Sequence, residues 1–221
     1  YGFSADLGGG PYERQKWLLR NTLPARRLFV RADAAPGTPA TYPTLIAAVS
    51  DVPVLVYYFP EICPTVGSTE EILQLCEIPN VVGLKFTDFD LYKMSILRRH
   101  GHVVFNGRDE VLVAGRLMGA NGGIGSFYNL VPELFLQLYH LTDSGRWIEA
   151  RAVQDRINEL IEIGLRCPSV AAIKTMLAWS GINCGQCLKP KRALSPDEES
   201  QLRTLLSRSS FAETVLLEKV V

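Results

Sequence analysis

The chain has 221 residues, of which 47% are apolar and 21% charged, so it can bury one large core and is not a disordered chain. Lys and Arg total 23 and Asp and Glu total 23, a balance without the basic excess typical of nucleic-acid-binding proteins. No apolar run approaches the roughly 18 residues of a membrane-spanning helix, and the first residues lack a signal-peptide pattern.

The first 50 residues carry weak patterns. They predict a helix over 12–20, a strand over 27–31 and a helix over 42–49, with glycine- and proline-containing loops between them.

After residue 50, short β-type runs alternate with helical stretches. Val52–Tyr58 is typical of a strand covered on both faces, and a capping box at Ser68 predicts a helix directly after it. The alternation repeats about every 20 residues, which indicates βα units and a parallel sheet. The other elements expected here are strands over 80–87, 102–106 and 122–126, a helix capped by Asp90, and a helix over 110–118.

The chain after residue 129 is expected to be helical and to add no strand. Helices are predicted over 132–140, 146–164 and 171–179, and a capping box at Ser195 begins one more. A complete eight-stranded barrel takes about 250 residues. The strand count therefore leaves two alternatives, an open α/β sheet or a barrel without its first units.

The cysteines form an odd, scattered set of five, which predicts reduced thiols in a reducing compartment. Cys184 and Cys187 make a C-x-x-C pair, but no second pair and no histidine spacing completes a structural zinc site. We therefore expect no bound metal. Because a leader pattern is also missing, we expect a cytoplasmic location.

A lysine inside an apolar strand is the first candidate for chemistry. Gly83, Lys85 and Thr87 share one face of the strand expected over 80–87. Desolvation favours the neutral amine, the form that attacks a carbonyl to make a Schiff base. The alternative is a lysine near a strand end whose ammonium group reaches water.

Two adjacent tyrosines, Tyr57 and Tyr58, end the preceding strand, and only one of them can point to the side of Lys85. A phenol beside a developing iminium could relay protons between substrate atoms. The alternative is an aromatic side chain that fills the core.

A polar turn and a glycine-rich segment follow. Asp109 and Glu110 could bind the hydroxyls of a polyol, or Asp109 could simply cap a helix. Residues 121–126 match neither a dinucleotide-binding fingerprint nor a phosphate-binding loop. The G-x-S-x-G signature of serine hydrolases is also absent from the sequence.

Taken in order, these segments resemble the N-acetylneuraminate lyase and dihydrodipicolinate synthase family of class I aldolases. The resemblance covers residues 42–207, and within the family it is closest to the N-acetylneuraminate lyases. The segments that carry it are YYFP, GLKFTD, NGRDE, GANGGIGSFYN, IKTMLAWSGI and CLKP.

The resemblance implies an α/β fold, a (β/α)8 TIM barrel with C-terminal helices that is incomplete at its N-terminal end. Residues 1–129 would hold the barrel units, with N-terminal units missing or divergent. Residues 130–221 would hold the last barrel helix and a helical extension of the same domain. The family's G-x-T-G-E-like loop, which holds the substrate carboxylate, is not found in this sequence.

The resemblance also implies roles for individual residues. Lys85 matches the lysine that forms the Schiff base with the pyruvyl ketone carbon, and Tyr57 matches the catalytic tyrosine. No metal or organic cofactor is needed, and family members are commonly tetramers, so a homo-oligomer is expected. The expected substrate-binding residues are Thr87, Gly107, Asp109, Glu110 and Ser126.

The expected reaction is cleavage of N-acetylneuraminate to N-acetylmannosamine and pyruvate. One alternative keeps the chemistry and changes the 2-keto acid, to a 2-keto-3-deoxy sugar acid, 4-hydroxy-2-oxoglutarate or a dihydrodipicolinate-type reaction. The alternative from another class is an inactive or truncated homologue, which the missing carboxylate-binding loop favours.

Overall fold

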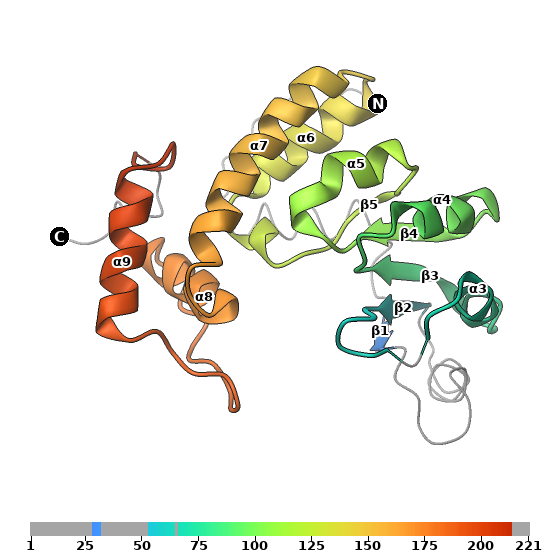
Figure 1. Ribbon diagram of the computed structural model, residues 1–221, viewed down its shortest axis with the longest axis horizontal. Helices are drawn as coiled ribbons and strands as arrows, with labels where there is room; N and C mark the ends of the chain where they lie inside the picture. The colour runs from blue at the N-terminus through green and yellow to red at the C-terminus, as the bar shows by residue number, and fades with distance from the viewer. Residues whose placement is uncertain (1–27, 32–52, 65, 214–221) are drawn as a thin grey trace. The chain divides into compact units, whose positions relative to one another are not determined.

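The computed structural model describes residues 28–31, 53–64 and 66–213 (Figure 1). The helices expected over 12–20 and 42–49 lie outside these ranges. The described residues fall into two compact units, divided between Gly125 and Ser126. In chain order the elements are β1 (Leu28–Arg31), β2 (Val54–Tyr58), α3 (Thr69–Cys76), β3 (Val81–Phe86), α4 (Leu91–Arg99), β4 (Val103–Asn106), η1 (Asp109–Val111), α5 (Leu112–Leu117), β5 (Gly122–Gly123), η2 (Phe127–Asn129), α6 (Pro132–Asp143), α7 (Trp147–Gly164), α8 (Ser169–Trp179) and α9 (Pro196–Ser207).

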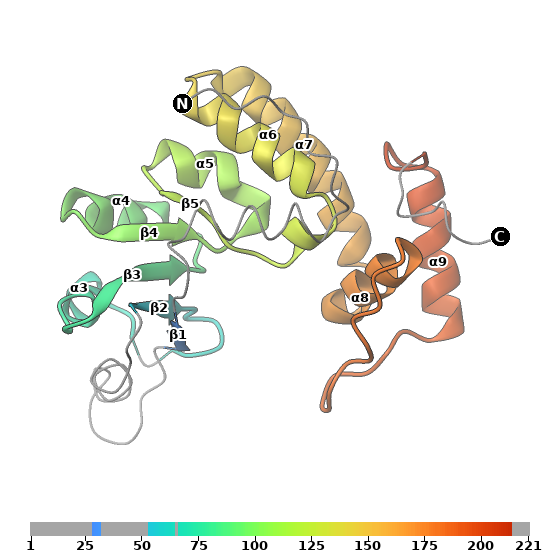
Figure 2. The ribbon, with the colours of Figure 1, turned by 180° about the vertical axis from the view of Figure 1, so that it is seen from behind.

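The first unit is built on a parallel sheet, as the sequence predicts. Its described strands lie in the order β1-β2-β3-β4-β5, and every neighbouring pair is parallel. The helices that connect these strands are seen from the two sides in Figures 1 and 2. A strand order that follows the chain without reversal is the winding of a barrel, whereas a doubly wound sheet reverses its order.

One face of this sheet packs against helices α3 and α4. Val56 and Tyr58 of β2, with Leu84 and Phe86 of β3, are each at most 1% exposed and belong to one apolar cluster. Each side chain buried to this extent stabilises the fold by roughly 1.5–3 kcal/mol. The helical members of the cluster are Ile72, Leu75, Cys76, Met94 and Leu97.

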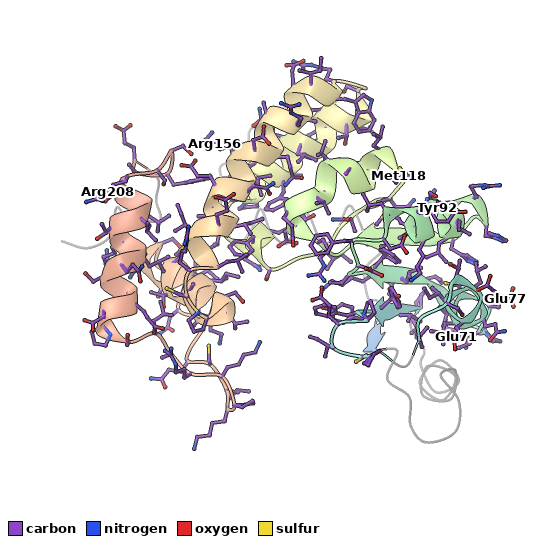
Figure 3. All side chains as sticks on the ribbon, viewed as in Figure 1. Glu71, Glu77, Tyr92, Met118, Arg156 and Arg208 are labelled. Carbon is purple, nitrogen blue, oxygen red and sulfur yellow. The ribbon has the colours of Figure 1, made fainter. Side chains whose placement is uncertain are left out.

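The helix starts follow the capping signals of the sequence. Ser68 and Glu71 form the expected capping box, in which the Glu71 amide donates to Ser68 Oγ and the Ser68 amide donates to Glu71 Oε2. Hydrogen bonds from the Ser68 and Gly67 amides to the carboxylate lower the pKa of Glu71, which Figure 3 labels on α3. Asp90 caps α4 by accepting the Lys93 amide at 3.0 Å, and Ser195 forms a second capping box before α9.

The second unit is helical, and residues 130–213 contain no strand, as expected. Helices α6 and α7 pack side by side through apolar faces that include Phe135 and Ile157. A side chain at Gly164 would lie 2.8 Å from the Phe127 ring, so this glycine lets η2 approach α7 closely. None of the helices in the described ranges is both long and apolar enough to span a membrane.

Two expected elements differ in the structure. The helix predicted over 110–118 is instead the short 3-10 helix η1 followed by α5, because the tight first turn carries Asp109 inward to a buried position. The strand predicted over 122–126 pairs with β4 only at Gly122 and Gly123. Its pairing ends where Gly125 packs against the Asp109 carboxylate.

Candidate functional site

The register between β2 and β3 decides which side chain lies beside Lys85. Val54 pairs with Val81, but Leu55 pairs with Gly83, so β3 carries one extra residue at a bulge. Beyond the bulge, Tyr57 lies opposite Lys85. Without the extra residue Tyr57 would face Leu84, because a one-residue slip exchanges the two faces of a strand.

Gly83 makes this bulge possible. Its φ is +152°, a conformation that residues with a side chain rarely adopt. A Cβ at this position would lie 2.8 Å from Val103 Cβ and 2.9 Å from the Val103 carbonyl carbon. Only glycine therefore lets β4 approach β3 here, and this approach fixes the strand that carries Lys85.

Lys85 and Tyr57 are in direct contact. The Lys85 Nζ atom lies 4.0 Å from the centroid of the Tyr57 ring, and both side chains are half-buried. They occupy the sheet face opposite the one that α3 and α4 cover. A lysine cation over the ring of a phenol is attracted by the negative face of that ring. The contact places side by side an amine and a phenol, a side chain that can carry protons.

Tyr58 lies on the other face, inside the apolar cluster. Its ring packs against Phe86 at 5.2 Å, and its hydroxyl donates to Asp88 Oδ2 over a long 3.4 Å. Burial, with a further contribution from the Asp88 charge, raises the pKa of Tyr58 to about 12. The structure thus brings Tyr57 to Lys85 and uses Tyr58 as a core residue.

Thr87 and Gly107 follow β3 and β4 and lie against each other. The Thr87 side chain is 5% exposed, and its Oγ1 has no hydrogen-bond partner within the described residues. A Cβ at Gly107 would lie 2.9 Å from Thr87 Cβ, so only a glycine fits beside this threonine. The arrangement leaves one buried hydroxyl free to bond a ligand two residues after Lys85.

Asp109 is buried in the turn after β4. Asp109 is 6% exposed, and a Cβ at Gly125 would lie 2.5 Å from Asp109 Oδ2. The interpretation of Asp109 as a helix cap is wrong, because Arg108 and Val111 are the N-cap residues of η1 and α5. The neighbouring Glu110 is half-buried.

Ser126, the remaining candidate, is the first residue of the second unit. Its side chain is exposed at the N-cap of η2, and its carbonyl oxygen accepts a hydrogen bond from Asn129 Nδ2 at 2.7 Å. The candidates in the first unit, by contrast, all lie at or just after the carboxyl ends of β2, β3 and β4. This is the edge at which parallel sheets bind ligands.

The sequence does not single out four of the residues at this edge, which are Asn106, Arg108, Phe59 and Phe89. Asn106 is fully buried, and its Nδ2 donates to the Arg108 carbonyl oxygen at 2.6 Å, which fixes the turn before Asp109. The Arg108 guanidinium lies over the rings of Phe59 and Phe89. The position of Asn106, a polar residue at the end of an apolar strand, could have marked it as a candidate site residue. No sequence pattern indicates the contacts of Arg108.

The described residues contain no group of three or more His, Cys, Asp or Glu side chains that could hold a metal ion. Cys184 and Cys187 are free thiols in the structure. The described side chains at this edge of the sheet offer an amine, a phenol, a hydroxyl and carboxylates.

Comparison with known proteins identifies the family of the chain. The Dihydrodipicolinate synthetase family matches residues 35–209. N-acetylneuraminate lyase 2 of Escherichia coli O6:H1 is 33% identical over 180 residues, which cover 80% of this chain and 57% of the relative. The N-acetylneuraminate lyase of Rhizobium meliloti is 34% identical over 161 residues, or 72% of this chain and 53% of the relative. The chain thus spans little more than half the length of these curated relatives.

Among solved structures, the chain is similar to CdNal from Clostridium difficile, determined in complex with mannosamine. The TM-score is 0.76 at 24% identity, over 82% of this chain and 64% of that protein. The likeness shows the fold, which is the α/β fold of the (β/α)8 barrel enzymes with additional C-terminal helices.

Proposed function

Because the chain belongs to the dihydrodipicolinate synthetase family, we propose that it is a carbon–carbon lyase that acts on 2-keto acids through a Schiff base at Lys85. The observation that carries the proposal is the contact between Lys85 Nζ and the Tyr57 ring, 4.0 Å apart at the carboxyl ends of β3 and β2. The pair supplies a nucleophilic nitrogen and a proton carrier at one point.

The reaction follows from this pair. The amine of Lys85 attacks the ketone carbon of the substrate, and loss of water leaves a protonated imine. The imine accepts the electron pair of the C3–C4 bond as that bond breaks, while the C4 hydroxyl loses its proton and becomes an aldehyde. The resulting enamine takes a proton at C3, and hydrolysis of the imine releases pyruvate and the free amine. Tyr57 carries protons to and from these atoms.

The proposed substrate is N-acetylneuraminate. The similar curated relatives named above are N-acetylneuraminate lyases, and the buried Asp109 and half-buried Glu110 offer carboxylates for the hydroxyls of a sugar chain. Thr87, Gly107 and Ser126 complete the proposed substrate-binding set. Another 2-keto acid, such as a 2-keto-3-deoxy sugar acid, is the second candidate because such substrates share the pyruvyl end that Lys85 would bind. Comparing kcat/KM for N-acetylneuraminate and 2-keto-3-deoxygluconate separates the two.

The decisive experiment traps the imine. The protein is incubated with pyruvate, reduced with borohydride and weighed by mass spectrometry, and we expect one reduced pyruvate per chain, located on Lys85. Lys85→Ala should give no adduct. Lys93→Ala is the matched control, because Lys93 lies in the adjacent helix α4 and pairs with Asp90 at 3.5 Å instead of facing the site. No adduct on the unaltered chain, or an adduct that survives Lys85→Ala, would reject the proposal and favour an inactive homologue.

We also propose a location and an assembly. The cysteines are free thiols, which supports a reducing compartment such as the cytoplasm. A homo-oligomer, a tetramer by family resemblance, is the proposed assembly. Sedimentation equilibrium of the full chain measures it directly.

A further inference from the structure

The side chains at the carboxyl ends of β2, β3 and β4 form one continuous stack. Lys85 Nζ lies 4.0 Å from the Tyr57 ring, and the Tyr57 and Phe59 rings stack with their centroids 5.9 Å apart and an interplanar angle of 28°. The Arg108 guanidinium lies 5.2 Å from the Phe59 ring and 4.3 Å from the Phe89 ring. We propose that Arg108 is a positioning residue that fixes the Tyr57 ring through Phe59. This inference rests on the proposed function.

Arg108 is held firmly enough to act in this way. Its side chain is only 14% exposed and forms an ion pair with Glu61. Its backbone is fixed as well, because the buried Asn106 donates from Nδ2 to the Arg108 carbonyl oxygen at 2.6 Å. A planar guanidinium can stack on aromatic rings and pair with a carboxylate at the same time, which an ammonium group does less well.

The contacts of Arg108 join three separate segments. Phe59 and Glu61 follow β2, Phe89 follows β3, and Arg108 itself follows β4. One side chain therefore ties together the turns that leave the strands of Tyr57 and Lys85. The pairing of the strands determines where these turns begin. The position of the Phe59 ring, which packs against Tyr57, depends in addition on its contact with Arg108.

Tyr57 needs such support because proton transfer depends on position. A proton carrier has to lie within hydrogen-bond distance of the atom it serves, and a displacement of 1 Å can cost up to about 100-fold in rate. Tyr57 is the last but one residue of β2 and only half-buried, so the core packing that holds Tyr58 does not hold it. Lys85 is likewise the last but one residue of β3, and the stack reaches it one step later, through the Tyr57 ring. Loss of Arg108 should therefore affect proton transfer more than imine formation.

The test compares Arg108→Met, Phe59→Leu and the double variant. We expect each single variant to lower kcat for 2-keto acid cleavage roughly tenfold, with KM changed less than about threefold, and to keep the borohydride-trapped pyruvate adduct. Because the two residues act in sequence, the double variant should lose no more than the worse single variant. The matched control is Arg116→Met, since Arg116 of α5 donates to the Ala120 carbonyl oxygen away from the stack, and its kcat should be unchanged.

Each outcome decides the proposal. Unchanged kcat in Arg108→Met, or losses that multiply in the double variant, would overturn it. If Arg108→Met does not fold, Arg108→Lys replaces it, because lysine keeps the charge but lacks the stacking plane. A severalfold lower kcat with intact trapping then supports the role of Arg108, and unchanged kcat overturns it. Failure of the unaltered chain to trap pyruvate rejects the proposed function itself, so the two failures are distinguishable.

Discussion

Replacement of Gly83 by alanine is the most direct test of the strand register that creates the site. Gly83 has a φ of +152°, and an added Cβ would lie 2.8 Å from Val103 Cβ and closer still to the Val103 carbonyl oxygen. A side chain in a sparsely populated backbone conformation costs about 1–3 kcal/mol. Overpacking against a neighbouring strand adds about 1–3 kcal/mol. The free energy of unfolding should therefore fall by about 2–6 kcal/mol in Gly83→Ala.

Urea denaturation followed by circular dichroism measures this loss. The matched control is Gly101→Ala, because Gly101 has a φ of +85° but no atom within 4 Å of an added Cβ. The free energy of unfolding of Gly101→Ala should fall only by the cost of the backbone conformation, about 1–2 kcal/mol. Because Lys85 lies two residues after Gly83, the pyruvate adduct should also fall in Gly83→Ala and persist in Gly101→Ala. Equal stability of the two variants would refute the argument that β4 excludes a side chain here.

Three further predictions concern single side chains. Tyr58→Phe should leave kcat unchanged and change the free energy of unfolding by no more than about 1 kcal/mol, because the hydrogen bond from the Tyr58 hydroxyl is long. Tyr57→Phe should instead lower kcat by roughly 10²–10⁴-fold. Steady-state kinetics of both variants checks this. Hydrogen bonding to Arg192 lowers the pKa of Glu198 from 4.5 to about 2, so its contribution to stability is present above pH 4.5 and is lost as the pH falls toward 2. Glu198→Gln should remove that part of the pH dependence in urea melts between pH 6 and pH 2. Leu84→Ala should cost about 2–5 kcal/mol because Leu84 is fully buried, and a loss below 1 kcal/mol would contradict the core assignment.

The local elements were predictable because their signals are local. Ser68, Asp90 and Ser195 each cap the helix that the sequence assigns to them. Strict alternation along β3 also places Gly83, Lys85 and Thr87 on one face without knowledge of the fold.

The partner of Lys85 could not be predicted in the same way. Alternation says that Tyr57 and Tyr58 face opposite sides, but the choice between them depends on the bulge at Gly83. That bulge is fixed by the approach of Val103 from a different strand, 20 residues further along the chain. The stack of Arg108 on Phe59 is a similar case, because it joins turns that no periodicity relates.

The order of the strands also bears on the length of the substrate. Neighbouring strands are about 4.8 Å apart, so β3 and β5 are separated by roughly 10 Å. Lys85 would bind the ketone end of the substrate at β3, while the Asp109 carboxylate lies between the end of β4 and Gly125, just past β5. A long sugar acid can extend across this distance and contact both Lys85 and Asp109. A short 2-keto acid bound at Lys85 ends before it reaches Asp109. Asp109→Asn should therefore lower kcat/KM for a long sugar acid and leave pyruvate trapping unaffected, and an equal loss for both would show that Asp109 serves the fold instead of the substrate.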